Sequence, residues 1–157
     1  MRISCIDPSR MIPDLGPPRQ DAWQVHCLSS FDEMARVIDV VLALLADLGY
    51  SRKDLFATRL VLEEAICNAI KHGHRCDPTK VVEVRYLVEA DYFLVEVEDQ
   101  GPGFDPARIP NATATDNRER PSGRGLLLMH CYAAWIRYNR AGNCVTFCIC
   151  PSERLPH

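Results

Sequence analysis

The sequence predicts an α+β domain, a two-layer α/β sandwich in which a mixed, mostly antiparallel sheet carries three helices on one face. Long helical patterns in the first half of the chain and two later pairs of alternating segments favour this class. The size agrees, because 157 residues with 47% apolar content can form one domain with one core.

Composition excludes several classes of protein. The net charge of −3 argues against a nucleic-acid binder, which normally carries a basic stripe. No apolar stretch approaches the roughly 20 residues that span a bilayer, and the first residues lack the apolar region of a signal peptide. We therefore expect a cytoplasmic protein that contacts neither nucleic acid nor membrane.

The chain has eight cysteines, which we expect to be free thiols in a reducing compartment. A zinc site is the alternative, because His72, His74 and Cys76 lie close together and His130 precedes Cys131. No Cys-x-x-Cys spacing supports that alternative.

The first half of the chain predicts a short strand and a helix. Apolar and polar residues alternate over 23–27, which indicates the strand. Apolar residues then recur at helical spacing over 31–48. Ser29 or Ser30 can cap this helix, and Gly49 ends it.

A second helix is predicted from Ser51, which forms a capping box with the acidic residue three positions later, to about His72, and it ends at Gly73. Glu64, Asn68 and His72 are four residues apart and therefore share one helix face, among apolar neighbours. A buried carboxylate and amide need partners, and a bound ligand or ion is one way to supply them.

Two hairpins are predicted in the second half. The segments 82–89 and 93–98 alternate as one antiparallel pair. The segments 135–138 and 144–150 form another pair, joined by a turn at 141–143.

Two glycine-rich segments lie between these hairpins. After Asp99, Gly101 and Gly103 straddle a proline and permit the chain to pass close to a ligand. Further along, Ser122-Gly123-Arg124-Gly125 opens an apolar helix. A glycine-rich turn leading into a helix N-terminus presents unpaired N–H groups and predicts an anion site. Each motif by itself is also compatible with a solvated helix face or an ordinary turn.

Taken together and in this order, the motifs resemble the N, G1 and G2 boxes of the Bergerat-fold (GHKL) ATPase superfamily. The three motifs are Glu64-x-x-x-Asn68-x-x-x-His72, Asp99-x-Gly101-x-Gly103-Phe104 and Gly123-x-Gly125-Leu126. The most similar subgroup is the anti-sigma-factor serine/threonine protein kinases, since the strings Glu-Ala-x-x-Asn-Ala-x-x-His-Gly and Gly-Arg-Gly-Leu are both typical of it.

The resemblance implies a role for each motif. Glu64 would be the catalytic general base that takes a proton from a serine hydroxyl, and Asn68 would be the protein ligand of Mg²⁺. Asp99 would accept a hydrogen bond from the adenine amine of ATP, while Gly101 and Gly103 would let the backbone approach the base. The other implied nucleotide contacts are Lys71, His72, Phe104, Arg120, Gly123, Arg124, Gly125, Leu126 and Thr146.

Several of these contacts carry more specific expectations. Backbone N–H groups over 123–126 would cradle the phosphates, with Arg124 or Arg120 adding charge, and Thr146 would reach the adenine. Lys71 and His72 can equally be contacts of the helix dipole at the C-terminus of the second helix.

The resemblance also implies partners and a domain plan. Residues 22–150 would form the ATP-binding kinase domain, with a lid at about 105–122, a flexible proline-rich arm at 1–21 and a tail at 151–157. The expected protein is a homodimer that binds a sigma factor and phosphorylates a serine of an anti-anti-sigma (antagonist) protein. The alternative is a non-catalytic ATP-binding module that only sequesters its partner. Retention of Glu64 favours the kinase.

Overall fold

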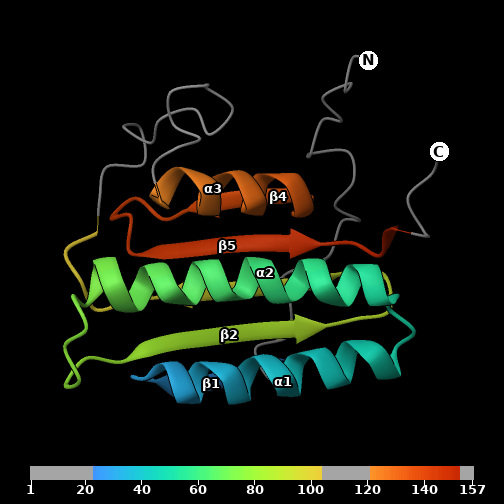
Figure 1. Cartoon of the computed structure of the whole chain (residues 1–157), viewed down its shortest axis with the longest axis horizontal. Helices are drawn as coiled ribbons and strands as arrows, with labels where there is room; N and C mark the ends of the chain where they lie inside the picture. Colours follow the sequence, from blue (N-terminus) through green and yellow to red (C-terminus); the bar gives the residue numbers. More distant parts are fainter. Residues whose placement is uncertain (1–22, 104–120, 153–157) are drawn as a thin grey trace.

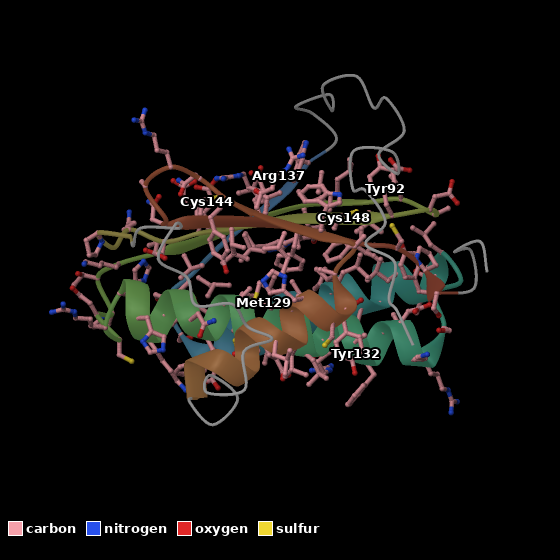
Figure 2. The ribbon with its side chains drawn as sticks, turned by 90° about the horizontal axis from the view of Figure 1, so that it is seen from above. Tyr92, Met129, Tyr132, Arg137, Cys144 and Cys148 are labelled. Carbon is pink, nitrogen blue, oxygen red and sulfur yellow. The ribbon has the colours of Figure 1, made fainter. Side chains whose placement is uncertain are left out.

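The computed structural model describes residues 23–103 and 121–152. Five strands form one sheet in the order β1-β2-β3-β5-β4, and all four pairings are antiparallel. Three α-helices cover one face of this sheet, as Figure 2 shows in a view along the layers. The predicted α+β sandwich is therefore confirmed. The elements are β1 (Gln24–Leu28), α1 (Phe31–Asp47), α2 (Arg52–Asn68), η3 (Ala69–Gly73), β2 (Val82–Val88), β3 (Phe93–Glu98), α3 (Pro121–Tyr132), β4 (Trp135–Tyr138) and β5 (Cys144–Ile149).

Three predicted segments fall mainly outside the described residues. These are the arm at 1–21, nearly all of the lid at about 105–122, and most of the tail at 151–157. Within the described parts of the chain, no helix is long and apolar enough to cross a membrane.

Helix α1 begins and ends where its sequence predicts. Ser30 is the N-cap, and its Oγ accepts a hydrogen bond from the N–H of Glu33 at 3.2 Å. The Glu33 carboxylate in turn accepts from the N–H of Ser29 at 2.7 Å, one residue before the N-cap, in a variant of the capping box. After the helix, Gly49 adopts a φ of 85°, a conformation that a side chain disfavours.

Helix α2 lies between α1 and α3 (Figure 1), so it is the central helix of its layer. Ser51 caps it by accepting from the N–H of Asp54, and the Ser51 hydroxyl donates to the Asp54 carboxylate at 2.8 Å. Asp54 is only 6% exposed and also accepts from the N–H of Ser152 at 3.2 Å. The start of α2 is thereby tied to the chain that follows β5.

The last predicted turn of this helix is not α-helical. From Ala69 to Gly73 the chain forms a π-helical turn, η3, in which the N–H of His74 donates to the carbonyl of Ala69 at 2.9 Å. Each π turn contains an extra residue, so the side chains after it rotate relative to a continuous α-helix. Arg75 and Cys76 then adopt positive φ values of 51° and 57°.

The sheet presents two different faces. The residues that face the helices are fully or nearly fully buried and form the core together with the helices: Val82, Val84, Tyr86, Phe93, Val95, Val97, Val145, Phe147 and Ile149. On the opposite face, Arg85 pairs with three carboxylates at 2.6–2.9 Å, those of Glu83, Glu96 and Glu98. A site between sheet and helices can therefore use only residues of the first face or of the strand ends.

Candidate functional site

The three predicted motifs meet along α2 and η3. A Cβ atom placed on Gly73 would lie 2.6 Å from Oδ1 of Asp99, and one on Gly101 would lie 2.7 Å from the carbonyl carbon of Gly73. A Cβ atom on Gly125 would lie 2.7 Å from Cδ of Glu64. Because these separations are shorter than van der Waals contact, the loop after β3 and the start of α3 both pack directly on the central helical segment.

Asp99 follows β3 and continues its pairing with the β4–β5 hairpin. Its N–H donates to the carbonyl of Asn143 at 2.9 Å, and the Asn143 side-chain amide donates to the Asp99 carbonyl at 3.0 Å. Alternate residues of a strand point to the same face, so Asp99 follows Val95 and Val97, whose side chains are buried on the helix-covered face. The Asp99 carboxylate therefore lies on the helix side of the sheet, against Gly73.

The Asp99 carboxylate has one engaged oxygen. Oδ1 accepts a hydrogen bond from the N–H of Gly101 at 2.7 Å, whereas Oδ2 has no hydrogen-bond partner among the described residues. Burial raises the pKa of Asp99, and the Gly101 N–H opposes this shift. One carboxylate oxygen is thus fixed, and the other has no protein partner in the described chain.

His74 is a buried member of this site that the sequence reasoning missed. It is 2% exposed, and its Nε2 lies 2.8 Å from the backbone N–H of Gln100. A backbone N–H can only donate, so Nε2 must carry the lone pair and Nδ1 the proton. From the sequence, His74 is expected only as a ligand of the alternative zinc site, and His72 as the histidine of the nucleotide site. Two histidines flank Gly73, and no local pattern distinguishes the buried one.

Glu64 and Asn68 lie on the part of α2 that faces the site. Both side chains are partly buried, and neither forms a hydrogen bond with the described residues. The contact with Gly125 brings α3 against Glu64, and the 1%-exposed Met129 anchors α3 to the core, between helix and sheet in Figure 2. These two polar groups are therefore held near the site without a protein partner in the described chain.

Lys71 and His72 are both exposed at the end of the central segment. The Lys71 ammonium lies 5.9 Å from the ring centroid of Phe31, in a cation–π contact with the start of α1. The structure gives His72 no comparable contact among the described residues.

Helix α3 begins earlier than predicted. It starts at Pro121, so the glycine-rich stretch forms its first turns and is not a turn that precedes it. Only the N–H groups of the first turn lack partners inside a helix, and Gly125 and Leu126 lie beyond that turn. Ser122 and Gly123 remain at the N-terminus. The structure describes only the backbone of 121–124 and 126, and Phe104 and Arg120 lie outside the described residues.

The prediction that Thr146 reaches the adenine is wrong. Its hydroxyl lies 3.5 Å from the Glu96 carboxylate, and its partner across the β4–β5 ladder is Arg137. Directly paired residues share a face, and Figure 2 shows Arg137 on the side of the sheet away from the helices. Thr146 therefore points away from a site that lies between sheet and helices.

The described residues offer no site for the alternative zinc ion. In the described ranges 23–103 and 121–152, no group of three or more His, Cys, Asp or Glu side chains is arranged to hold a metal ion. The seven described cysteines are free thiols.

Comparison with known proteins identifies the family. Residues 28–149 match the histidine kinase-like ATPase domain. The chain is 34% identical over 109 residues to Anti-sigma F factor of Anoxybacillus flavithermus, which covers 68% of this chain and 73% of that protein. It is 33% identical over 109 residues to Anti-sigma F factor of Geobacillus stearothermophilus, with the same coverage of 68% and 73%. For Anti-sigma F factor of Clostridium perfringens, identity is 35% over 95 residues, 59% of this chain and 67% of the relative.

These similarities confirm the resemblance that the three motifs predict. An ATPase domain implies a site for ATP, and the N, G1 and G2 motifs contact one another through Gly73, Gly101 and Gly125. The chain belongs to the histidine kinase-like ATPase domain family, in its anti-sigma-factor group.

Proposed function

We propose that this protein is an ATP-dependent protein-serine kinase that binds a sigma factor and phosphorylates a serine of an anti-anti-sigma protein. The names of its relatives support the sigma-factor partner. The observation that carries the kinase assignment is the placement of the Glu64 carboxylate against Gly125, on the same helical segment that meets Asp99. We propose that the protein acts in the cytoplasm as a homodimer.

The residues present fit an adenine nucleotide with Mg²⁺. Glycines at 73, 101 and 125 let the three motifs pack closely on one another, because a Cβ at these positions would meet the Asp99 side chain, the Gly73 backbone and the Glu64 side chain. Oδ2 of Asp99 and the side chain of Asn68 have no hydrogen-bond partner in the described chain. The Asn68 carbonyl is a hard oxygen donor of the type that Mg²⁺ prefers.

Asp99 and the loop after it would select adenine. Oδ1 is fixed by Gly101, so Oδ2 can accept the hydrogen bond of an exocyclic amine in a defined direction. Gly103 has a φ of 72°, and a Cβ there would lie 2.9 Å from the carbonyl carbon of Ala141. The loop can follow this path only with glycine at 103. Phe104 would continue the wall of the base pocket.

Glu64 would act as the general base. Its carboxylate would take the proton from the attacking serine hydroxyl, and Asn68, one turn further along α2, would hold the metal ion. When bound, Mg²⁺ neutralises charge on the phosphates as the transferred group leaves. The N–H groups of Ser122 and Gly123 at the start of α3 would hold phosphate oxygens. Arg120, Arg124, Lys71 and His72 remain proposed phosphate contacts, and Gly125 and Leu126 would line the same wall.

The competing function is a non-catalytic module that binds ATP and sequesters a partner. Labelled ATP, Mg²⁺ and candidate antagonist proteins distinguish the two functions when wild type is compared with Glu64→Gln. Loss of transfer with unchanged ATP affinity supports the kinase. Absent or equal transfer in both proteins, with ATP bound, supports the binding module.

A further inference from the structure

We propose that His74 is a positioning residue for adenine recognition, whose buried imidazole sets the direction of the Asp99 carboxylate by accepting the hydrogen bond of the Gln100 N–H. The inference rests on the proposed role of Asp99 as the adenine acceptor. It adds a residue outside the three motifs to the base-recognition machinery.

The hydrogen bonds around Asp99 fix its backbone on both sides. The N–H of Asp99 donates to Asn143 of the neighbouring hairpin at 2.9 Å. The next N–H, that of Gln100, donates to Nε2 of His74 at 2.8 Å. The third, that of Gly101, donates to Oδ1 of Asp99 at 2.7 Å. Three successive N–H groups are thus engaged, and the His74 bond is the one that ties this loop to the helical layer.

The orientation of His74 follows from the π turn. In a continuous α-helix successive side chains rotate by about 100°, so one extra residue turns the following side chains by a similar angle. The N–H of His74 completes this turn at Ala69, and the His74 carbonyl accepts from the N–H of Asp77 at 3.0 Å. The backbone of His74 is therefore fixed by hydrogen bonds at both its N–H and its carbonyl group, which restricts the positions that its imidazole can adopt.

The segment after His74 is also closed by hydrogen bonds. Arg75 and Cys76 take the left-handed conformation, which is strained for residues with a side chain. The N–H of Cys76 donates to the carbonyl of Ile70 at 2.9 Å, which holds the chain in this conformation. The turn is thus closed directly after His74, which is 2% exposed.

The chemistry at position 74 requires a neutral acceptor. An aliphatic side chain would leave the Gln100 N–H without its partner, so the peptide after Asp99 could rotate. A glutamine can place a carbonyl oxygen near the same point and accept the bond. His74→Leu and His74→Gln therefore separate loss of the acceptor from loss of the imidazole.

The test measures discrimination between two nucleotides by calorimetry with Mg²⁺. The probes are ATP and purine riboside triphosphate, which lacks the exocyclic amine. We expect His74→Leu to weaken ATP binding by roughly tenfold and the analogue by less than about twofold, so the preference for ATP falls. His74→Gln should retain most of the preference. His130→Leu, which removes an exposed imidazole on α3, is the matched control and should retain all of it.

Equal losses for both nucleotides in His74→Leu would overturn the inference, because a residue that only supports the fold cannot change the ratio. If that variant does not fold, the ¹⁵N shifts of the His74 ring in the wild-type protein decide the question. An unprotonated Nε2 supports the inference, and a protonated Nε2 overturns it. Asp99→Ala, which removes both carboxylate oxygens, tests the underlying function separately. If it preserves the preference for ATP, the proposed role of Asp99 fails, whatever His74 does.

Discussion

Replacing Gly125 by alanine should displace the Glu64 carboxylate without unfolding the protein. An ideal Cβ at 125 lies 2.7 Å from Cδ and 3.4 Å from Cγ of Glu64. Non-bonded carbon atoms approach to about 3.5–4 Å, so the carboxyl carbon has to move by about 1 Å. The obstructing atoms are the end of a flexible side chain, and rotation about its bonds can accommodate them.

The magnitudes differ for activity and stability. A misplacement of about 1 Å at a reacting group costs on the order of 100-fold in rate. Position 125 lies inside α3, where alanine is favoured over glycine by about 1 kcal/mol. We therefore expect a large loss of phosphate transfer and a melting temperature that is unchanged or slightly higher.

The assay combines phosphate transfer from labelled ATP with thermal denaturation. Gly125→Ala is measured alone and in the Glu64→Gln background, where the base is already absent. If the substitution acts through Glu64, the double variant should be no less active than Glu64→Gln alone. Full transfer activity in Gly125→Ala, or a further loss in the double variant, would refute this reasoning.

Three further predictions concern buried and paired charges. Burial raises the pKa of Asp99, so folding favours its protonated form; the resulting gain in stability is complete at low pH and is lost as pH rises through the raised pKa. Asp99→Asn should therefore raise the melting temperature at neutral pH while weakening ATP binding. As the pH is lowered, the wild-type affinity for ATP should begin to fall at a higher pH than it would with an aspartate of ordinary pKa. Both are measurable by calorimetry, and a lower melting temperature in the variant would contradict the linkage. Arg85→Met should lower the free energy of unfolding by about 1–2 kcal/mol in urea denaturation, because it leaves three neighbouring glutamates unpaired. Added salt should reduce that loss. A loss that does not depend on salt would indicate that Arg85 stabilises the fold through packing instead. Asp54→Ala should cost about 1–3 kcal/mol in the same assay, because it removes the acceptor of the Ser51 hydroxyl and of the Ser152 N–H. A loss under about 0.5 kcal/mol would exclude that role.

The elements with a clear apolar period were predicted closely from the sequence. Helix α1 starts at Phe31 after the Ser30 cap, and β3 spans Phe93–Glu98 as its alternation indicates. In both, the spacing of apolar residues reports directly which side is buried. The order of the N, G1 and G2 motifs similarly identified the family before any contact was known.

Two errors arose where the local sequence is ambiguous. Every residue of β5 except Thr146 is apolar, so alternation cannot tell which face Thr146 occupies, and a change of one position reverses the face. The pairing with β3 and β4 decided it. In α3, the glycines suggested a turn, but the helix already begins at Pro121, and Gly125 packs within it against Glu64 on α2.

The sequence by itself determined the class of fold and the family, because these depend on periodicity and on the spacing of a few side chains. Only the tertiary structure decided that the second helix ends in a π turn and that His74, not His72, is buried against the loop of Asp99. The local sequence does not indicate whether a backbone N–H bonds to the carbonyl four residues back, as in an α-helix, or five residues back, as in a π turn. That choice depends on the contacts that the side chains make after the turn, and the partners in those contacts come from distant parts of the chain.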